Sequence, residues 1–171
     1  LGFFDFRNGT NTTNLFFNVP HATDRISYCL GDSSPVPTST EFATPAGALS
    51  DSGWHHVVWQ RRSNTLEIYV DGRLAQSGSF TGTVNNSSRA VEVGRQSTDG
   101  SNFNGMISNL RIVKGTAVYT ANFTPPTEPL TNVNNTKLLC CNSSTSATAA
   151  TVIPSGSITA NGGAFATRNE L

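Results

Sequence analysis

Residues 54–77 have the sequence WHHVVWQRRSNTLEIYVDGRLAQS, and this stretch decides the fold. Two runs rich in β-branched and aromatic residues flank the turn segment 62–65, as in a β-hairpin. Asp71-Gly72 is a strong signal for a type I′ turn, because both central positions of that turn need a positive φ angle. The stretch therefore predicts three consecutive antiparallel strands, Trp54–Arg61, Thr65–Asp71 and Arg73–Ser77.

The turn at 62–65 also predicts which residues of the hairpin face each other. Either a two- or a four-residue loop pairs Arg61 with Leu66, Trp59 with Ile68 and Val57 with Val70. Cross-strand partners share one face of a sheet. We expect the apolar face to cover the core: Val57, Trp59, Leu66, Ile68 and Val70. The opposite face is polar and only partly in water, with Leu74 beside Tyr69: His56, Val58, Gln60, Glu67, Tyr69 and Asp71.

The rest of the chain has short β-rich runs separated by Gly, Asn, Ser and Pro, and no sustained helical period. This pattern predicts an all-β fold, a two-sheet antiparallel jelly-roll sandwich. The further expected strands are Phe3–Arg7, Leu15–Val19, Arg25–Leu30, Ala90–Gly94, Phe103–Val113, Thr136–Cys141 and Ser157–Ala160. Residues 32–45 are expected as a loop, 121–129 as an extended proline arm, and 142–151 as a loose connector.

The expected domain organisation has two parts. Residues 1–141 form the jelly-roll sandwich, and residues 142–171 form a connector and a short β extension packed on the same domain. The chain begins at Leu1 and shows no signal peptide, so we expect a fragment or a processed product.

The composition argues against several partners. Of the 171 residues 13% are charged and the net charge is zero, which gives no electrostatic reason to expect nucleic acid or an anionic membrane. No apolar run approaches the ~20 residues that span a bilayer. We therefore expect neither nucleic-acid binding nor membrane insertion.

The cysteines are Cys29, Cys140 and Cys141, and this odd count argues against a complete disulfide framework. Adjacent residues of a strand point to opposite faces, so only one of Cys140 and Cys141 is expected to reach Cys29. Three reduced thiols are the main expectation, and a Cys29 bridge is the alternative. No Cys-x-x-Cys motif or nearby His completes a zinc site, so we expect no metal there.

Catalytic arrangements are not evident. Glycoside cleavage needs two carboxyl groups ~5–9.5 Å apart. Glu67 and Asp71 share a face but lie four strand positions apart, roughly 13 Å at ~3.3 Å per residue. His55 and His56 point to opposite faces and cannot chelate one ion, while His56 is placed to bond Asp71 across the hairpin. We therefore predict that the protein is not an enzyme.

Four motifs resemble the laminin-G-like members of the concanavalin A-like lectin/glucanase superfamily. They are GWHHVV at 53–58, NTLEIYVDG at 64–72, VEVG at 91–94 and FNGMISNLRI at 103–112. The resemblance implies a jelly roll, although Phe4-Asp5-Phe6 only approximates the usual opening motif and leaves open whether the N-terminal strands are complete. It also leaves open a calcium site at a loop rim, for which the chain offers Asp32, Asp51, Asp71 and Asp99.

Glycan binding is the sharper functional option for the hairpin. Sugars are held by aromatic faces together with planar polar groups. The polar face of the hairpin supplies such a set: His56, Gln60, Tyr69 and Asp71. The alternative is a face covered by solvent or by a partner. Arg111 lies in an apolar strand, and we expect it to be a paired buried charge or to lie at an interface.

The C-terminal part is similar to jelly-roll modules of phage virion proteins, through GTAVYTANFTPP at 115–126 and TKLLC at 136–140. This resemblance implies a virion or extracellular location, in a tail fibre, an appendage or a capsid decoration. It further implies assembly as a homo-oligomer or with other virion proteins, and binding to a cell-surface glycan. The alternatives are a stand-alone secreted lectin-like domain and, third, a glycan hydrolase.

Overall fold

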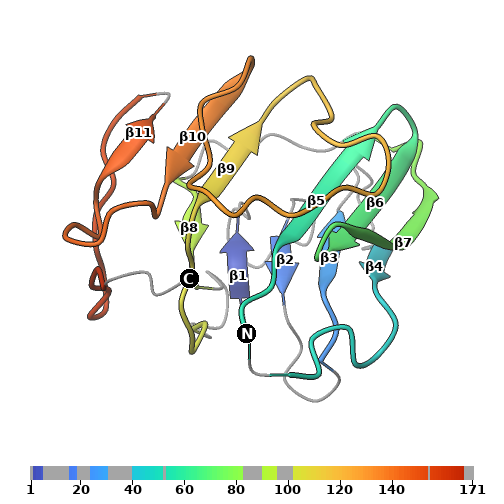
Figure 1. Ribbon diagram of the computed structural model, residues 1–171, viewed down its shortest axis with the longest axis horizontal. Coiled ribbons are helices and arrows are strands. Elements are labelled where there is room, and N and C mark those ends of the chain that lie inside the picture. Colours follow the sequence, from blue (N-terminus) through green and yellow to red (C-terminus); the bar gives the residue numbers. More distant parts are fainter. Residues whose placement is uncertain are drawn as a thin grey trace, which may run out of the picture. The chain divides into compact units, whose positions relative to one another are not determined.

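The computed structural model describes residues 2–5, 16–18, 24–30, 40–51, 53–82, 90–95, 102–153 and 155–167. The described residues form strands, turns and irregular segments without a helix, and all their strand pairs are antiparallel (Figure 1). The predicted all-β antiparallel fold is confirmed. None of the described residues belongs to a helix that could cross a membrane. Contacts divide the chain into two units, Leu1–Gly105 and Met106–Leu171, and the expected division at residue 141 stays a prediction.

The first unit contains a five-stranded sheet. In spatial order its strands are β4 (Thr40–Ala43), β3 (Ser27–Leu30), β2 (Phe16–Asn18), β1 (Gly2–Asp5) and β8 (Glu92–Val93). The four runs expected as strands in this part of the chain each overlap one of them. Strand β4 was not expected, because residues 32–45 carry three prolines. All three prolines lie outside Thr40–Ala43, so none removes a donor from the ladder that β4 forms with β3.

The second sheet of this unit is the predicted three-stranded one. Its strands are β5 (Val57–Arg62), β6 (Thr65–Val70) and β7 (Arg73–Ser79), drawn in green in Figure 1. The predicted register is confirmed: Arg61 pairs with Leu66, Trp59 with Ile68, Val57 with Val70, and Tyr69 with Leu74. The turns use positive φ angles at Ser63, Asp71 and Gly72, as a tight turn between twisted strands requires.

The core of the unit lies between these two sheets. It is formed by Ile26, Leu66, Ile68 and Phe80, with Phe42, Leu49, Val57, Trp59 and Val70 packed around them. The prediction that the apolar hairpin face covers the core is therefore confirmed. A Cβ atom added to Gly78 would lie 2.5 Å from the ring of Phe42, so a glycine is required where β7 approaches this ring.

The C-terminal unit has a three-stranded sheet in the order β11 (Ala150–Val152), β10 (Thr136–Cys140) and β9 (Leu110–Val113). Three expectations fail here: residues 103–109 and Ser157–Ala160 are not strands, and the connector 142–151 ends in β11. The connector is ordered by its hydroxyls, because Ser143 Oγ accepts the N–H groups of Thr145 (3.3 Å) and Ser146 (3.1 Å). Such local bonds make a Ser/Thr-rich segment a defined turn.

The adjacent cysteines do not point to opposite faces as expected. Cys140 is the last residue of β10, and Cys141 leaves the strand with a φ angle of +58°. The two Sγ atoms consequently lie 3.6 Å apart, and both groups are thiols. The alternative of a bridge from Cys29 to one of this pair is therefore not formed, and the side chain of Cys29 itself lies outside the described part of the structure.

Candidate functional site

The polar face of the hairpin contains a buried carboxylate. Glu67 is 2% exposed, and its two oxygens accept hydrogen bonds from Gln60 Nε2 at 2.6 Å and from Arg62 Nη2 at 2.7 Å. Burial raises the pKa of Glu67, but the bonds from Arg62 and Gln60 outweigh it, so the pKa lies below its ordinary value. Both oxygens are thus held as charged acceptors within the hairpin.

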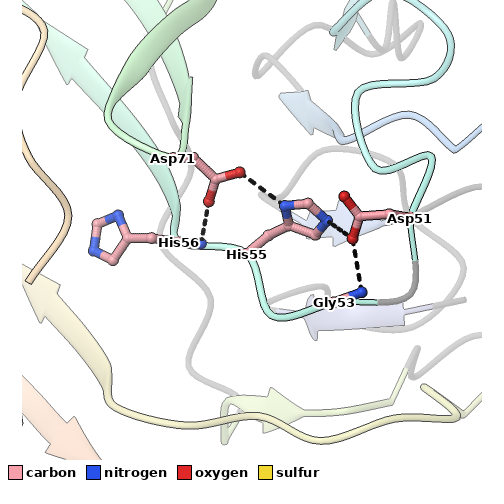
Figure 2. Close-up of polar contacts among 5 residues, drawn as sticks. All are labelled: Asp51, Gly53, His55, His56 and Asp71. Atoms are coloured by element: carbon pink, nitrogen blue, oxygen red, sulfur yellow. Dashed lines mark hydrogen bonds and ion pairs between the residues drawn. The ribbon is translucent and has the colours of Figure 1, made fainter. Parts of the chain in front are cut away.

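A second polar group ties the start of β5 to the β6–β7 turn (Figure 2). Asp71 Oδ2 accepts a hydrogen bond from His55 Nδ1 at 2.8 Å, and Oδ1 accepts the backbone N–H of His56 at 2.9 Å. On the other side of the ring, His55 Nε2 lies 3.3 Å from Asp51 Oδ1, which also accepts the N–H of Gly53. We call Asp51, His55 and Asp71 the histidine bridge.

The histidine bridge corrects one expectation from the sequence. The imidazole that bonds Asp71 belongs to His55, whereas His56 contributes its backbone N–H and its ring points away from Asp71 (Figure 2). The two rings point to opposite sides as expected (Figure 2), but Asp71 follows the end of β6 at Val70 and has a φ angle of +48°, so its side chain does not follow the alternation of the strand. Burial raises the pKa of Asp71, and the bonds from His55 and His56 more than offset this, so the pKa is lowered.

The four residues predicted to bind carbohydrate are therefore engaged within the hairpin to different degrees. Tyr69 is only 1% exposed, Gln60 bonds Glu67, and Asp71 holds His55 and the backbone of His56. The expectation of a partly wet face is wrong for Tyr69 and Glu67, because both side chains are buried. Burial and the negative charge of Glu67 also raise the pKa of Tyr69. Carbohydrate binding by this set stays a prediction.

The sequence predicts no metal site and leaves open only a calcium site at a loop rim. In the parts of the chain that the structure describes, no three His, Cys, Asp or Glu side chains gather around one point. Asp51 and Asp71 face different nitrogens of one imidazole. Asp32 and Asp99 lie outside the described residues, and calcium binding stays a prediction.

The C-terminal unit contains an open groove of about 330 Å³, which we call the Arg111 groove. It is lined by Arg111, Tyr119, Pro126, Thr127, Glu128, Pro129, Leu130 and Thr131. Arg111 projects from β9 and donates from Nη1 to the carbonyl of Thr131 at 3.0 Å. The ring of Tyr119 stacks on Phe123, with centroids 3.6 Å apart. The sequence singles out Arg111 and the proline arm separately, but it contains no signal that they line one groove.

A backbone irregularity holds the far wall of this groove. Asn109 has a φ angle of +54°, and its Oδ1 accepts the N–H of Leu130 at 3.0 Å. Its own N–H donates to the carbonyl of Cys141 at 2.8 Å. The side chain of Asn109 thus ties the end of the proline arm to the start of β9.

Comparison with known families gives one result for this chain. A laminin G family model, described as the concanavalin A-like lectin/glucanases superfamily, matches residues 2–120. The chain belongs to this family. No curated protein and no solved structure matches the chain.

Membership of the concanavalin A-like superfamily confirms the resemblance drawn from the hairpin motifs and suggests a carbohydrate-binding or adhesion module. The superfamily includes glucanases as well as lectins, so membership alone does not decide whether a member is an enzyme. Arg111 and Tyr119 lie inside the matched residues, whereas the stretch 126–131 lies beyond them. The likeness of the C-terminal part to virion modules stays a prediction.

Proposed function

We propose that this chain is a non-catalytic adhesion module that binds carbohydrate in the Arg111 groove. Binding pockets for small ligands combine aromatic and apolar walls with a few polar groups that fix orientation. The groove has this composition: the ring of Tyr119, two prolines, a guanidinium and a carboxylate line one concave surface. This composition is the observation that carries the proposal.

The polar groups of the groove retain hydrogen-bonding capacity. In the described part of the chain, Arg111 has the Thr131 carbonyl as its hydrogen-bond partner, which leaves the donors of Nε and Nη2 for a ligand. Glu128 is exposed and makes no hydrogen bond or ion pair with the described residues. A sugar has vicinal hydroxyl groups that accept from a guanidinium and donate to a carboxylate, so both groups suit a saccharide.

The carboxylates of the chain support a binding role over hydrolysis. Glycoside cleavage uses two carboxyl groups, and the groove lining contains one, Glu128. Glu67 is buried with both oxygens bonded. Asp51 and Asp71 are separated by the imidazole of His55. Among these described carboxylates, Glu67, Asp51 and Asp71 are thus each buried or engaged with other groups of the fold, and Glu128 has no second carboxylate beside it in the groove lining.

We further propose that the module belongs to a virion, as part of a tail fibre, an appendage or a capsid decoration. The segments 115–126 and 136–140 support this setting, because they carry the likeness to phage modules and contribute Tyr119 and Pro126 to the groove. A stand-alone secreted lectin-like domain is the alternative. Mass spectrometry of purified virus particles tests this setting. If the protein is not detected in them, the virion setting is excluded and the secreted domain remains.

A glycan array probed with the whole chain tests the binding proposal. We expect hits whose affinity falls at least about tenfold, or roughly 1.4 kcal/mol, in Arg111→Ala and Tyr119→Ala. Arg95→Ala is the matched control, because Arg95 is an exposed arginine that lies 3.8 Å from Glu92 outside the groove. An array without hits, or hits lost only in Gln60→Ala and Asp71→Asn, would contradict a site in the groove. Release of reducing ends from the bound glycan would contradict the non-catalytic role.

A further inference from the structure

The end of strand β10 places two thiols side by side. The Sγ atoms of Cys140 and Cys141 are 3.6 Å apart, so one thiol can donate a hydrogen bond to the other. Neighbouring residues of a regular strand would point apart. The pair is close because the φ angle of Cys141 is +58°, a conformation that costs free energy for a residue with a Cβ atom.

The surrounding backbone maintains this arrangement. Asn109, which also has a positive φ angle, donates its N–H to the carbonyl of Cys141 at 2.8 Å. The pairing of β10 with β11 shifts register between Leu139 and Cys140, immediately before the thiol pair. Asn109 and Cys141 thus both have left-handed backbone conformations and are hydrogen-bonded to each other across two segments. Together with the register shift, they form a local departure from regular sheet geometry. Strained positions of this kind persist only where neighbouring contacts hold them, and they often mark a functional site.

The two thiols differ in accessibility and in acidity. Cys140 is 3% exposed, whereas Cys141 is only half-buried. The hydrogen bond from Cys140 lowers the pKa of Cys141, even though burial opposes this. The same hydrogen bond, with burial and the negative charge of Cys141, raises the pKa of Cys140. Cys141 is therefore the nucleophile of the pair, since the thiolate is the reactive form of cysteine.

We propose that Cys140 and Cys141 are a redox modification site, at which a low-molecular-weight disulfide converts the two thiols into a reversible vicinal disulfide. The Cys141 thiolate attacks one sulfur of the external disulfide, forms a mixed disulfide and expels one thiolate. Cys140 then loses its proton to solvent and attacks the Cys141 sulfur, which expels the second thiolate. The external disulfide is reduced to two thiols, which take up the two protons, and the cysteine pair is oxidised by two electrons.

The geometry predicts that this disulfide is easily reduced. Adjacent Cα atoms are about 3.8 Å apart, which is shorter than the roughly 4.4–6.8 Å usual for bridged cysteines. Closing the bond also requires the sulfurs to move from 3.6 Å to about 2.05 Å apart. A bridge formed under such strain has a more oxidising potential than a structural disulfide, and it belongs to the labile class.

The test uses the whole chain carrying Cys29→Ser, treated with excess oxidised glutathione under native conditions. Trypsin cleaves after Lys137, so Cys140 and Cys141 remain in one peptide, and Cys29 lies in another. We expect this peptide to lose about 2 Da without a glutathione adduct and to resist alkylation. Mild reduction with dithiothreitol should restore two thiols that can be alkylated.

Two further variants separate the steps. Cys29→Ser with Cys140→Ser should stop at a stable glutathione adduct on Cys141, because the second thiol is missing. Cys29→Ser with Cys141→Ser should react much more slowly, because Cys140 is buried. Circular dichroism of each variant checks that the sheet is retained. Three results would overturn the proposal. They are two free thiols after oxidation of Cys29→Ser, a persistent glutathione adduct in that variant, and a peptide linked to Cys29 in the unmodified chain.

Discussion

The β5–β6–β7 sheet and the β9–β10–β11 sheet use their polar side chains in opposite ways. In the hairpin sheet, Glu67 and Asp71 accept hydrogen bonds from neighbouring segments, so their carboxylate oxygens stabilise the fold. In the C-terminal unit, Arg111 of β9 and Glu128 of the proline arm line an open groove and keep further hydrogen-bonding capacity. The first sheet uses these polar groups within the fold, and the second carries the residues to which we assign binding and thiol chemistry.

The backbone shows the same difference. The hairpin places its positive φ angles at Ser63, Asp71 and Gly72, where tight turns need them. The C-terminal unit also has turn positions of this kind, such as Asn135, but Asn109 and Cys141 have positive φ angles beside a groove and a thiol pair. Irregular backbone on a rigid sheet is where binding residues concentrate in proteins. Substitutions in the regular hairpin and in the irregular C-terminal sheet should therefore have different effects on stability and on binding.

The largest effect should come from the centre of the hairpin. Ile68 is fully buried, so Ile68→Ala removes core contacts and leaves a cavity, and we expect a loss of about 2–5 kcal/mol in the free energy of unfolding. The same substitution at Ile153, which is 39% exposed next to β11, should cost less than about 1 kcal/mol. Urea unfolding measures both. Equal losses would mean that stability is not concentrated in the hairpin.

The buried carboxylate should have the next largest effect. Glu67→Ala leaves the Gln60 amide without its acceptor, and we expect a loss of about 1–3 kcal/mol by the same urea measurement. Glu128→Ala is the control and should lie within about 0.5 kcal/mol of the unmodified chain, because Glu128 is exposed. A comparable loss at both positions would mean that the buried, hydrogen-bonded carboxylate contributes no more to stability than the exposed one.

The same carboxylate predicts how stability depends on pH. Since the pKa of Glu67 is lowered on folding, its contribution is complete above the unfolded pKa and is lost as the pH falls through the folded pKa. The pKa of Asp71 is lowered as well, so it adds a loss of the same sign. We expect the free energy of unfolding to fall from pH 6 towards pH 3, and less steeply in Glu67→Gln. Parallel pH profiles would contradict this assignment.

The hairpin was also the part that the sequence predicts best. Its register depends on local turn chemistry at 62–65 and at Asp71-Gly72, and every predicted pair is present. The burial of Tyr69 was not predictable, because strand alternation assigns a residue to one face of a sheet and says nothing about whether that face is covered. The role of His55 was missed because its partner Asp71 lies in the turn after β6, where the side chain does not follow the alternation of the strand.

The C-terminal sheet was harder to predict for a related reason. Strand β11 forms only because hydroxyls such as Ser143 Oγ order the preceding turn, and Ser/Thr-rich composition predicts a loose connector instead. The proximity of Cys140 and Cys141 depends on a single φ angle. The Arg111 groove unites residues up to twenty positions apart in the sequence. Local sequence patterns do not reveal such contacts, so the groove could not be predicted from the sequence, and carbohydrate binding by the hairpin face stays a prediction.

A smaller effect is expected for the histidine bridge. Asp71→Asn keeps the size of the side chain but weakens the bonds to His55 and to the His56 N–H, and we expect a loss of about 0.5–1.5 kcal/mol. Asp51→Asn is the matched control on the other side of the ring. It should cost less, because the side chain of Asp51 is 73% exposed and that of Asp71 is 48% exposed. Thermal unfolding of the two variants ranks them, and a larger loss at Asp51 would reverse the assignment.

The smallest effect on stability should come from Glu128→Gln, and this variant tests the contrast most directly. The side chain is exposed, so we expect a change within about 0.5 kcal/mol in the free energy of unfolding. The carboxylate is the acceptor that we assign to a sugar hydroxyl, and an amide is a weaker acceptor. Affinity for a glycan identified on the array should therefore fall about tenfold while stability is unchanged. Titration calorimetry at constant ionic strength measures this, because Glu128 is a surface charge and its long-range effects are screened by salt. If Glu128→Gln retains affinity while Arg111→Ala abolishes binding, the guanidinium alone orients the ligand. If both variants bind normally, the groove is not the binding site.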